Sequence, residues 1–254
     1  MSARITRRAL LGGLAAGAGG LLSGCDALGQ DETFRTLLFK GGDWNQWTQR
    51  ALMDRGALAR EFRPDERSPV FRTNGTRDPG TPDYAAHAAN GFADWRVRVD
   101  GLVARPQAFG VSQLLSMPQR AQITRHDCVE GWSAIGKWQG PRLATLLDAA
   151  GLRDTARYIV FHCADLYGGG RRYYESIDLI DALHPQTILA LGLNDRRLGI
   201  GHGAPVRLRV ERQLGYKHAK YVERIEAVAD LSGVYGGKGG LWEDIADYEW
   251  YAGI

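Results

Sequence analysis

Three short segments that alternate apolar and polar residues constrain this chain most, because a period of two marks a β-strand with one buried face. They are residues 95–101, 206–210 and 221–225. The first ends in Asp-Gly, which favours a turn. Residues 158–163 form a continuous apolar run, as in a fully buried strand. The sequence therefore predicts strand-rich sheets.

Helical spacing of apolar residues appears in several other segments. Residues 142–150 place leucines and alanines on one face and are followed by Gly151, which favours a helix end there. Residues 111–115 predict a shorter helix, and residues 177–183 a helix that stops before Pro185. Helices mixed with strands predict the α+β class, with mixed, strand-rich sheets.

Two further segments, before the first predicted strand, differ in composition. Residues 44–62 carry apolar side chains at mixed helical spacings and predict one peripheral helix. Residues 71–92 are rich in Gly, Pro, Asp and Asn and predict a long loop. We expect a leader at 1–25, a tether with the peripheral helix at 26–69, and the main domain at 70–254. No stretch reaches the roughly 20 apolar residues of a spanning helix.

The first 25 residues have the layout of an export signal: a basic start, an apolar segment and Ser-Gly-Cys. The pair Arg7-Arg8 resembles a twin-arginine motif, which implies export of the folded chain. An ordinary secretory leader is the alternative. Residues 22–25 resemble a lipobox, which implies lipidation of Cys25, although a chance cysteine near a cleavage site has the same appearance. We expect a periplasmic protein, lipid-anchored to the inner membrane.

The formal net charge of +3 comes from the leader. The leader contributes three of the 32 Lys and Arg residues, Arg4, Arg7 and Arg8. The other 29 basic residues equal the 29 Asp and Glu residues in number. A neutral body offers no basic surface for nucleic acid, so we expect no nucleic-acid partner.

Two cysteines remain after Cys25, and their residue type alone leaves three interpretations. Cys128 and Cys163 suit a disulfide in an exported protein, or two small buried side chains, or a metal ligand at Cys128. The sequence has no CxxC, CxxCH or paired Cys/His metal spacing that would decide between them.

The surroundings of Cys128 carry a family resemblance. Residues 126–133 and 138–141 resemble the cofactor-binding segment of the sulfite oxidase family, especially its bacterial periplasmic branch of methionine sulfoxide reductases. Four further motifs match in order, at residues 173–177, 182–187, 202–208 and 215–220. The resemblance implies a sulfite-oxidase-type molybdopterin-binding fold and an oxidoreductase that transfers oxygen atoms in two-electron steps.

The resemblance also implies a site. Cys128 would bind molybdenum as a thiolate, a soft donor suited to such a metal, beside a single molybdopterin. Arg207 and Lys220 suit the phosphate of the pterin. The other cofactor-binding positions that the resemblance implies are Asn74, Cys163, His202, His218 and Ala219. Each of these residues alone has an ordinary structural explanation as a solvated strand or loop residue.

Tyr173 matches a family tyrosine near the metal. A phenol there can donate a hydrogen bond to the transferring oxygen, or serve as an aromatic wall of the pocket. Both roles remain open, and Tyr173 joins Cys128 as a catalytic candidate.

The direction of the reaction rests on two differences from sulfite-oxidising members, which place arginines before the loop asparagine and after the cysteine. Here Thr73 precedes Asn74, and residues 129–132 carry no arginine. Loss of both cations disfavours a divalent anion. We expect reduction of a neutral sulfoxide or related S- or N-oxide. Sulfite oxidation, a non-catalytic lipid-anchored binding module, and a zinc or copper protein are the alternatives.

The partners follow from what the sequence lacks. It has no c-type haem signature, so a separate electron-transfer partner is expected: a membrane haem or quinone-linked protein, or a cytochrome. A small molecule is the expected substrate, and the lipid anchor the only membrane contact. The aromatic segment at 242–254 resembles the terminus of the family's domain, without a dimerisation domain, and a monomer is expected.

Overall fold

A computed structural model describes residues 30–254 of the chain. The chain divides into two units, up to Gln49 and from Arg50 to Ile254, and the second contains all the sheets. The expected twin-arginine motif and Cys25 lie outside the described residues. Within residues 30–254, no helix combines the length and the apolar character needed to cross a membrane.

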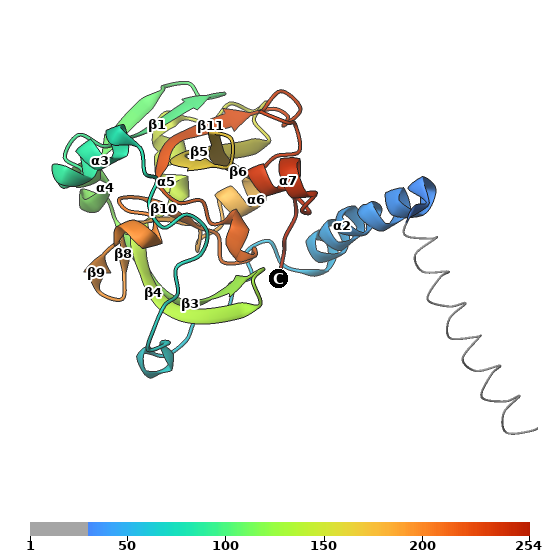
Figure 1. Ribbon diagram of the computed structural model, residues 1–254, viewed down its shortest axis with the longest axis horizontal. Coiled ribbons are helices and arrows are strands. Elements are labelled where there is room, and N and C mark those ends of the chain that lie inside the picture. The colour runs from blue at the N-terminus through green and yellow to red at the C-terminus, as the bar shows by residue number, and fades with distance from the viewer. Residues whose placement is uncertain (1–29) are drawn as a thin grey trace, which may run out of the picture. The chain divides into compact units, whose positions relative to one another are not determined.

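A five-stranded mixed sheet forms the centre of the second unit, in the order β2-β1-β11-β5-β6 (Figure 1). β1 pairs in parallel with β11, and the other neighbours are antiparallel. Its strands are β1 (Arg96–Gly101), β2 (Gln107–Gly110), β5 (Tyr158–Tyr167), β6 (Arg171–Asp178) and β11 (Val222–Val228). This architecture confirms the α+β class.

The sequence patterns predict this part of the fold well. Val97 and Val99 are fully buried in β1, whereas Arg96 and Arg98 face outward. Two helices also lie where helical spacing placed them, α4 (Val111–Ser116) and α5 (Leu143–Ala150). α5 ends because Gly151 adopts a left-handed backbone, with φ of 71°.

A long hairpin of β3 (Gln119–Cys128) and β4 (Trp132–Pro141) was missed by the sequence analysis. The buried positions of β3 are polar (Gln122, Thr124 and His126), and those of β4 alternate Ala134 and Trp138 with two glycines, so no run of large apolar residues marks the hairpin. The hairpin extends through β8 (Gly192–Leu193) to β9 (Arg196–Arg197). Beside it, β7 (Ile188–Ala190) pairs with β10 (Arg207–Arg209).

Three other expectations need correction. The predicted helix at 44–62 is α2 (Glu32–Leu52), which is followed by a turn where Gly56 N donates to the Asp54 carboxylate. The predicted loop at 71–92 contains α3 (Pro82–Ala89), which is capped by Thr81. The predicted helix at 177–183 is shortened to α6 (Leu179–Ala182), because β6 runs on to Asp178.

Short helical segments complete the chain. They are η1 (Pro64–Glu66), η2 (Ile200–His202), η3 (Gly215–Lys217) and α7 (Leu241–Ala246). η2 leads into η3 through β10, and α7 covers the end of β6 near the C-terminus (Figure 1).

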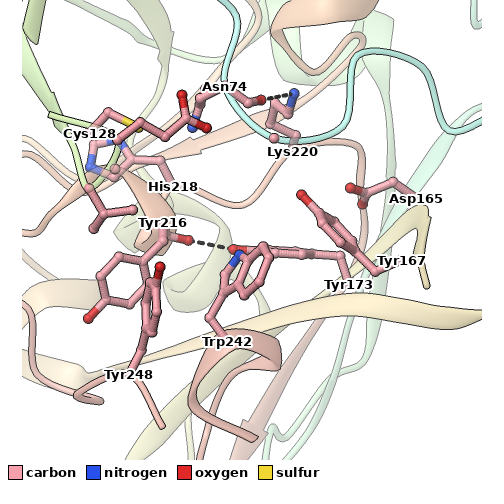
Figure 2. A pocket seen from close by; sticks show the side chains of 14 residues that line it. Asn74, Cys128, Asp165, Tyr167, Tyr173, Tyr216, His218, Lys220, Trp242 and Tyr248 are labelled. Carbon is pink, nitrogen blue, oxygen red and sulfur yellow. Dashed lines mark hydrogen bonds between the residues drawn. The ribbon is translucent and has the colours of Figure 1, made fainter. Parts of the chain in front are cut away.

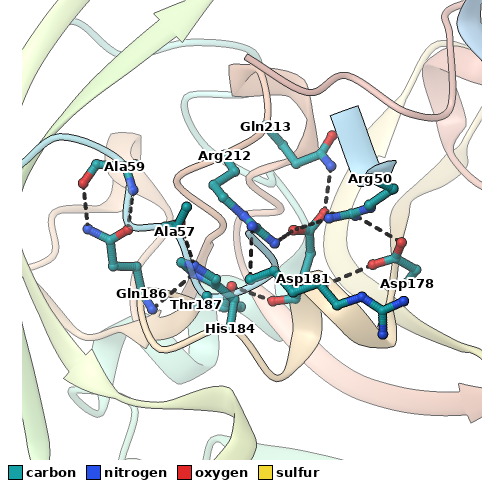
Figure 3. Close-up of polar contacts among 12 residues, drawn as sticks. Arg50, Ala57, Ala59, Asp178, Asp181, His184, Gln186, Thr187, Arg212 and Gln213 are labelled. Atoms are coloured by element: carbon teal, nitrogen blue, oxygen red, sulfur yellow. Dashed lines mark hydrogen bonds and ion pairs between the residues drawn. The ribbon is translucent and has the colours of Figure 1, made fainter. Parts of the chain in front are cut away.

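Buried polar contacts hold the end of α2 and the segment that follows it against the rest of the second unit (Figure 3). Asp181 accepts hydrogen bonds from Arg50 at 2.8 Å, Arg212 at 2.6 Å and Gln213 at 2.7 Å. Burial alone would raise the pKa of Asp181, but these donors lower it below its usual value. Further along, Gln186 accepts from the Ala59 amide at 2.7 Å. Residues 50–61 are therefore fixed by specific hydrogen bonds.

Candidate functional site

A cavity of about 160 Å³ lies between the β3–β4 hairpin and the end of the five-stranded sheet (Figure 2). Five of the residues selected from the sequence line it: Asn74, Cys128, Tyr173, His218 and Lys220. The cavity is also lined by residues that the sequence analysis did not select: Gly75, Val129, Glu130, Asp165, Tyr167, Gly215, Tyr216, Trp242 and Tyr248.

Cys128 is the last residue of β3, and its thiol is half-buried at the cavity. A three-residue turn follows it, in which the Gly131 amide donates to the Cys128 carbonyl at 3.0 Å. Gly131 has a φ of 83°, which only glycine adopts without strain, so the tight turn fixes the direction of the cysteine. Burial raises the pKa of the free Cys128 thiol.

Cys163 lies elsewhere, fully buried in the core on β5. Its sulfur is near the Phe161 carbonyl, at 4.0 Å, and it is not among the residues that line the cavity. Both cysteines are free thiols, so the disulfide interpretation is wrong. Cys163 is a core side chain whose pKa burial raises well above the usual value.

Arg207 is a fully buried cation on β10. It donates to the His202 carbonyl at 3.3 Å and to the Asn74 amide oxygen at 3.1 Å, and neither acceptor carries a charge. Its Nε has no partner among the described residues. Burial, followed by the charge of Arg209, lowers the pKa of Arg207 to about 9. A buried guanidinium with neutral partners suits an anionic ligand.

Lys220 is a second buried cation, and only 6% of its surface is exposed. Its ammonium donates to the carbonyls of Asn74, at 2.7 Å, Gly201, at 3.1 Å, and Thr76. Burial and the nearby Arg207 lower the pKa of Lys220 to about 7. Gly203 must be glycine here, because a Cβ would approach the Lys220 side chain to 2.9 Å and its φ is 102°.

The two predicted histidines are neutral. Burial, then Arg207 and Lys220, lower the pKa of His202 to about 4, and its Nδ1 has no partner in the described chain. His218 donates from Nε2 to the Gln213 carbonyl at 3.0 Å, which leaves Nδ1 as an unpartnered acceptor. Both rings can therefore take part in one further hydrogen bond.

His126 is a third neutral histidine that the sequence analysis did not select. Its Nδ1 accepts from Arg209 at 2.9 Å, so its Nε2 carries the proton and is unpartnered among the described residues. The ring lies edge-on to His218, with centroids 5.1 Å apart. A Cβ at Gly215 would lie 2.6 Å from the His126 ring, so glycine is needed at that position.

Ala219 has its backbone groups engaged within the protein. Its carbonyl accepts from Leu208 at 2.8 Å and its amide donates to Lys217 at 3.2 Å. The side chains on either side of it, His218 and Lys220, are the ones that line the cavity.

Tyr173 belongs to a row of aromatic side chains that lines one side of the cavity (Figure 2). Its hydroxyl donates to the Tyr216 carbonyl at 2.6 Å, so its oxygen can still accept a hydrogen bond. Consecutive ring centroids lie 5.1 to 5.7 Å apart. We call this set the aromatic collar, and its members are, in order, Tyr173, Tyr167, Trp242, Tyr248 and Tyr216.

Buried charges lie behind the collar and fix its segments. Lys217 on η3 contacts the carboxylates of Glu175 on β6 and Glu243 on α7, and all three side chains are at most 1% exposed. Burial and the neighbouring Glu243 raise the pKa of Glu175 well above its usual value. Each of the three charged residues lies within two positions of a collar residue, so the cluster ties the collar's strands and helices together.

Two carboxyl groups face the cavity unexpectedly. Glu130 is an exposed residue of the turn after Cys128. Asp165 on β5 is buried, with an unpartnered Oδ1 among the described residues, and burial raises its pKa to about 6. The position of Glu130 in the turn after Cys128 could be read from the sequence. Nothing in the sequence marked Asp165 as a cavity residue, because it follows the apolar run of a buried strand.

The donor set of the cavity suits a thiolate-bound metal in an anionic cofactor. A zinc site built from the protein alone would need three or four Cys, His, Asp or Glu ligands. No group of three such side chains lies together within residues 30–254. Cys128 is a single soft donor, and the cations near Asn74 suit a phosphate.

Comparison with known proteins agrees with this chemistry. The family described as "Oxidoreductase molybdopterin binding domain" matches residues 84–235. The putative protein-methionine-sulfoxide reductase subunit YedZ1 of Azospira oryzae is 35% identical, over 98% of this chain and 86% of the relative. A likeness to the sulfane dehydrogenase SoxCD of Paracoccus pantotrophus has a TM-score of 0.49 and 22% identity, over 54% of this chain. This chain spans 39% of that structure's length.

Proposed function

The chain belongs to the family of oxidoreductases with a molybdopterin-binding domain, and we propose that it uses a molybdenum-molybdopterin bound through Cys128 to reduce a neutral sulfoxide. One observation carries the proposal: two buried cations, Arg207 and Lys220, meet at Asn74, which lines the same cavity as the Cys128 thiol.

The residues present fit this cofactor. Arg207 and Lys220 have neutral hydrogen-bond partners, so a phosphate would supply the missing negative charge. The unpartnered nitrogens of His202 and His218 would take pterin or phosphate groups. The Cys128 thiolate would be the protein's ligand to the metal. Bound molybdenum supplies a two-electron store for oxygen-atom transfer.

The charge around Cys128 supports a neutral substrate. Where sulfite-oxidising relatives are expected to carry arginine, the turn carries Glu130, which lines the cavity. A carboxylate there repels sulfite and leaves an uncharged sulfoxide unaffected.

The aromatic collar supports a sulfur-containing substrate. Aromatic rings pack favourably against sulfur and methyl groups. The collar presents Trp242 and Tyr248 at the opposite side of the cavity from Cys128 (Figure 2). The Tyr173 hydroxyl donates to the Tyr216 carbonyl, which fixes the Tyr173 ring as a wall of the cavity. The relative named as a methionine-sulfoxide reductase subunit points to a thioether sulfoxide.

The cellular setting is part of the proposal. The relative is named as a subunit, which supports a separate electron-transfer partner. We propose a membrane haem or quinone-linked protein, or a cytochrome, in that role. The twin-arginine-type leader and Cys25 support a periplasmic location with a lipid anchor in the inner membrane.

The test is metal analysis and turnover of chain purified from a host that makes the cofactor. We expect bound molybdenum, and methionine sulfoxide reduced by a low-potential dye much faster than sulfite is oxidised. Preferred turnover of sulfite would overturn the substrate assignment. Folded chain that binds no molybdenum would identify a non-catalytic binding module instead.

A further inference from the structure

The helix α2 has an apolar face that is exposed. Leu37, Trp44 and Trp47 lie at helical spacing on it and are 51%, 61% and 72% exposed. Glu32, on the other face of the helix, is also exposed. Exposed tryptophans on one side of a 21-residue helix are unusual, because burying each would gain free energy.

We propose that this face of α2 lies in the headgroup region of a lipid bilayer. Tryptophan is the residue most suited to that layer, since its ring is apolar and its N–H needs a polar partner. An amphipathic helix of this length can lie in the plane of the interface. The proposal concerns where the chain binds, and it does not depend on the proposed reaction.

The position of Cys25 places the helix within reach of such a surface. α2 begins at Glu32, seven residues after the lipobox cysteine. Seven extended residues span at most about 24 Å. If Cys25 carries acyl chains, the start of α2 is held near the bilayer, and the tether makes insertion of the tryptophans an intramolecular event.

The charges of the helix indicate what kind of surface it takes. α2 carries two acidic residues, Glu32 and Asp43, and three basic ones, of which Arg50 is paired with Asp178 and Asp181. The other two, Arg35 and Lys40, balance the acidic residues, so the helix gains little from anionic lipid. The proposal therefore commits to insertion of the apolar face, with little dependence on lipid charge.

The experiment uses the chain from Asp26 onward with its cofactor, so that neither the apolar leader nor acylation of Cys25 contributes. It is mixed with phosphatidylcholine vesicles whose acyl chains are brominated, and tryptophan fluorescence is recorded. We expect quenching that disappears in the Trp44→Phe, Trp47→Phe variant. Adding anionic lipid changes it little.

A second variant measures the affinity. Replacing Trp44 and Trp47 by serine should weaken partition of the chain from Asp26 onward by about tenfold for each ring. Val70→Ser and Tyr235→Ser, which change side chains that are 71% and 56% exposed in the second unit, are the matched controls and should leave partition unchanged. Sulfoxide turnover in vesicle-free solution should be the same in all of them.

The opposite results would overturn the proposal. Quenching that persists in the Trp44→Phe, Trp47→Phe variant would place other tryptophans at the lipid. If the chain shows no quenching with the phosphatidylcholine vesicles, the apolar face of α2 does not enter lipid, and the proposal is wrong. Loss of sulfoxide turnover with normal quenching would count against the proposed function alone.

Discussion

Arg207 donates a hydrogen bond from Nη2 to the side-chain oxygen of Asn74 across 3.1 Å, although the two residues are 133 positions apart. The main-chain oxygen of the same asparagine accepts from Lys220. One loop residue therefore binds both buried cations, and it does so with neutral oxygens. The arrangement leaves two positive charges near the cavity with no compensating negative charge from Asn74.

The buried charge of Arg207 should therefore lower the unfolding free energy of the chain when the cofactor is absent. Arg207→Met is expected to raise the unfolding free energy of the cofactor-free chain by about 1 kcal/mol and to abolish cofactor loading. Arg209→Met is the matched control. Arg209 pairs with buried Glu211, so its loss should destabilise the chain by about 3–5 kcal/mol. Chemical denaturation and molybdenum content measure the two effects, and equal stability changes would contradict the explanation.

Cys128 should be needed for the metal and not for the fold. Cys128→Ser is expected to lose molybdenum and keep its melting temperature, because the side chain is half-exposed at a turn. Cys163→Ala should keep molybdenum and lose about 1–2 kcal/mol of unfolding free energy, because that thiol fills core space. Metal analysis of the two proteins side by side decides the point. Retention of metal by the serine variant would exclude Cys128 as the ligand.

Anion binding to the cofactor-free chain should depend on pH through Lys220. Because the pKa of Lys220 is lowered to about 7, its ammonium is charged below that pH and neutral above it. The affinity for sulfate, whose own charge is constant, should rise as the pH falls from about 8.5 to about 6. Titration calorimetry measures it. Lys220→Met should make the sulfate affinity nearly independent of pH, and the surface variant Lys137→Met should leave its pH dependence unchanged. A steep pH dependence that remains in Lys220→Met would show that another group causes it.

Glu130 should act on substrate choice. Glu130→Gln removes a negative charge beside Cys128, and the KM for sulfite is expected to fall by about threefold to tenfold. The kcat for a neutral sulfoxide should change little. Asp127→Asn alters a carboxylate of the same hairpin that does not line the cavity, and it should leave both constants unchanged. Steady-state kinetics with the two substrates measures these effects. If the constants for sulfite and for the sulfoxide changed together in Glu130→Gln, Glu130 would not act through its charge.

Trp242 should contribute to binding of the sulfur substrate. Trp242→Leu opens the aromatic collar and is expected to raise the KM for methionine sulfoxide by about tenfold. Trp250→Leu is the control, because Trp250 packs on Tyr158 and donates to Ser176, away from the cavity. An unchanged KM in Trp242→Leu would remove the collar from substrate recognition.

The sequence predicted the parts of this fold that bury apolar side chains at regular spacing. β1, α4 and α5 have such patterns, and the α+β class and the sulfite-oxidase-type molybdopterin-binding family are confirmed. The β3–β4 hairpin could not be found in this way. The buried side chains of β3 are the polar Gln122, Thr124 and His126, and β4 alternates buried Ala134 and Trp138 with glycines, so neither strand has a regular run of large apolar residues.

The candidate site was predicted through family resemblance, and spacing alone would not have found it. Asn74, Cys128, His218 and Lys220 are brought to one cavity from loops far apart in the chain. The collar was missed because its members come from β5, β6, η3 and the C-terminal segment, and only tertiary contacts join them. The metal ligand, the catalytic residues and the cellular location remain predictions.

The aromatic collar also sets an order of events while the chain is being made. Its first members follow the cysteine by fewer than fifty residues, but Trp242 and Tyr248 are made much later. While the chain is still on the ribosome at residue 240, the cavity lacks one wall. The aromatic side of the cavity is therefore complete only after the C-terminal segment has been made and has packed against Tyr167 and Tyr216.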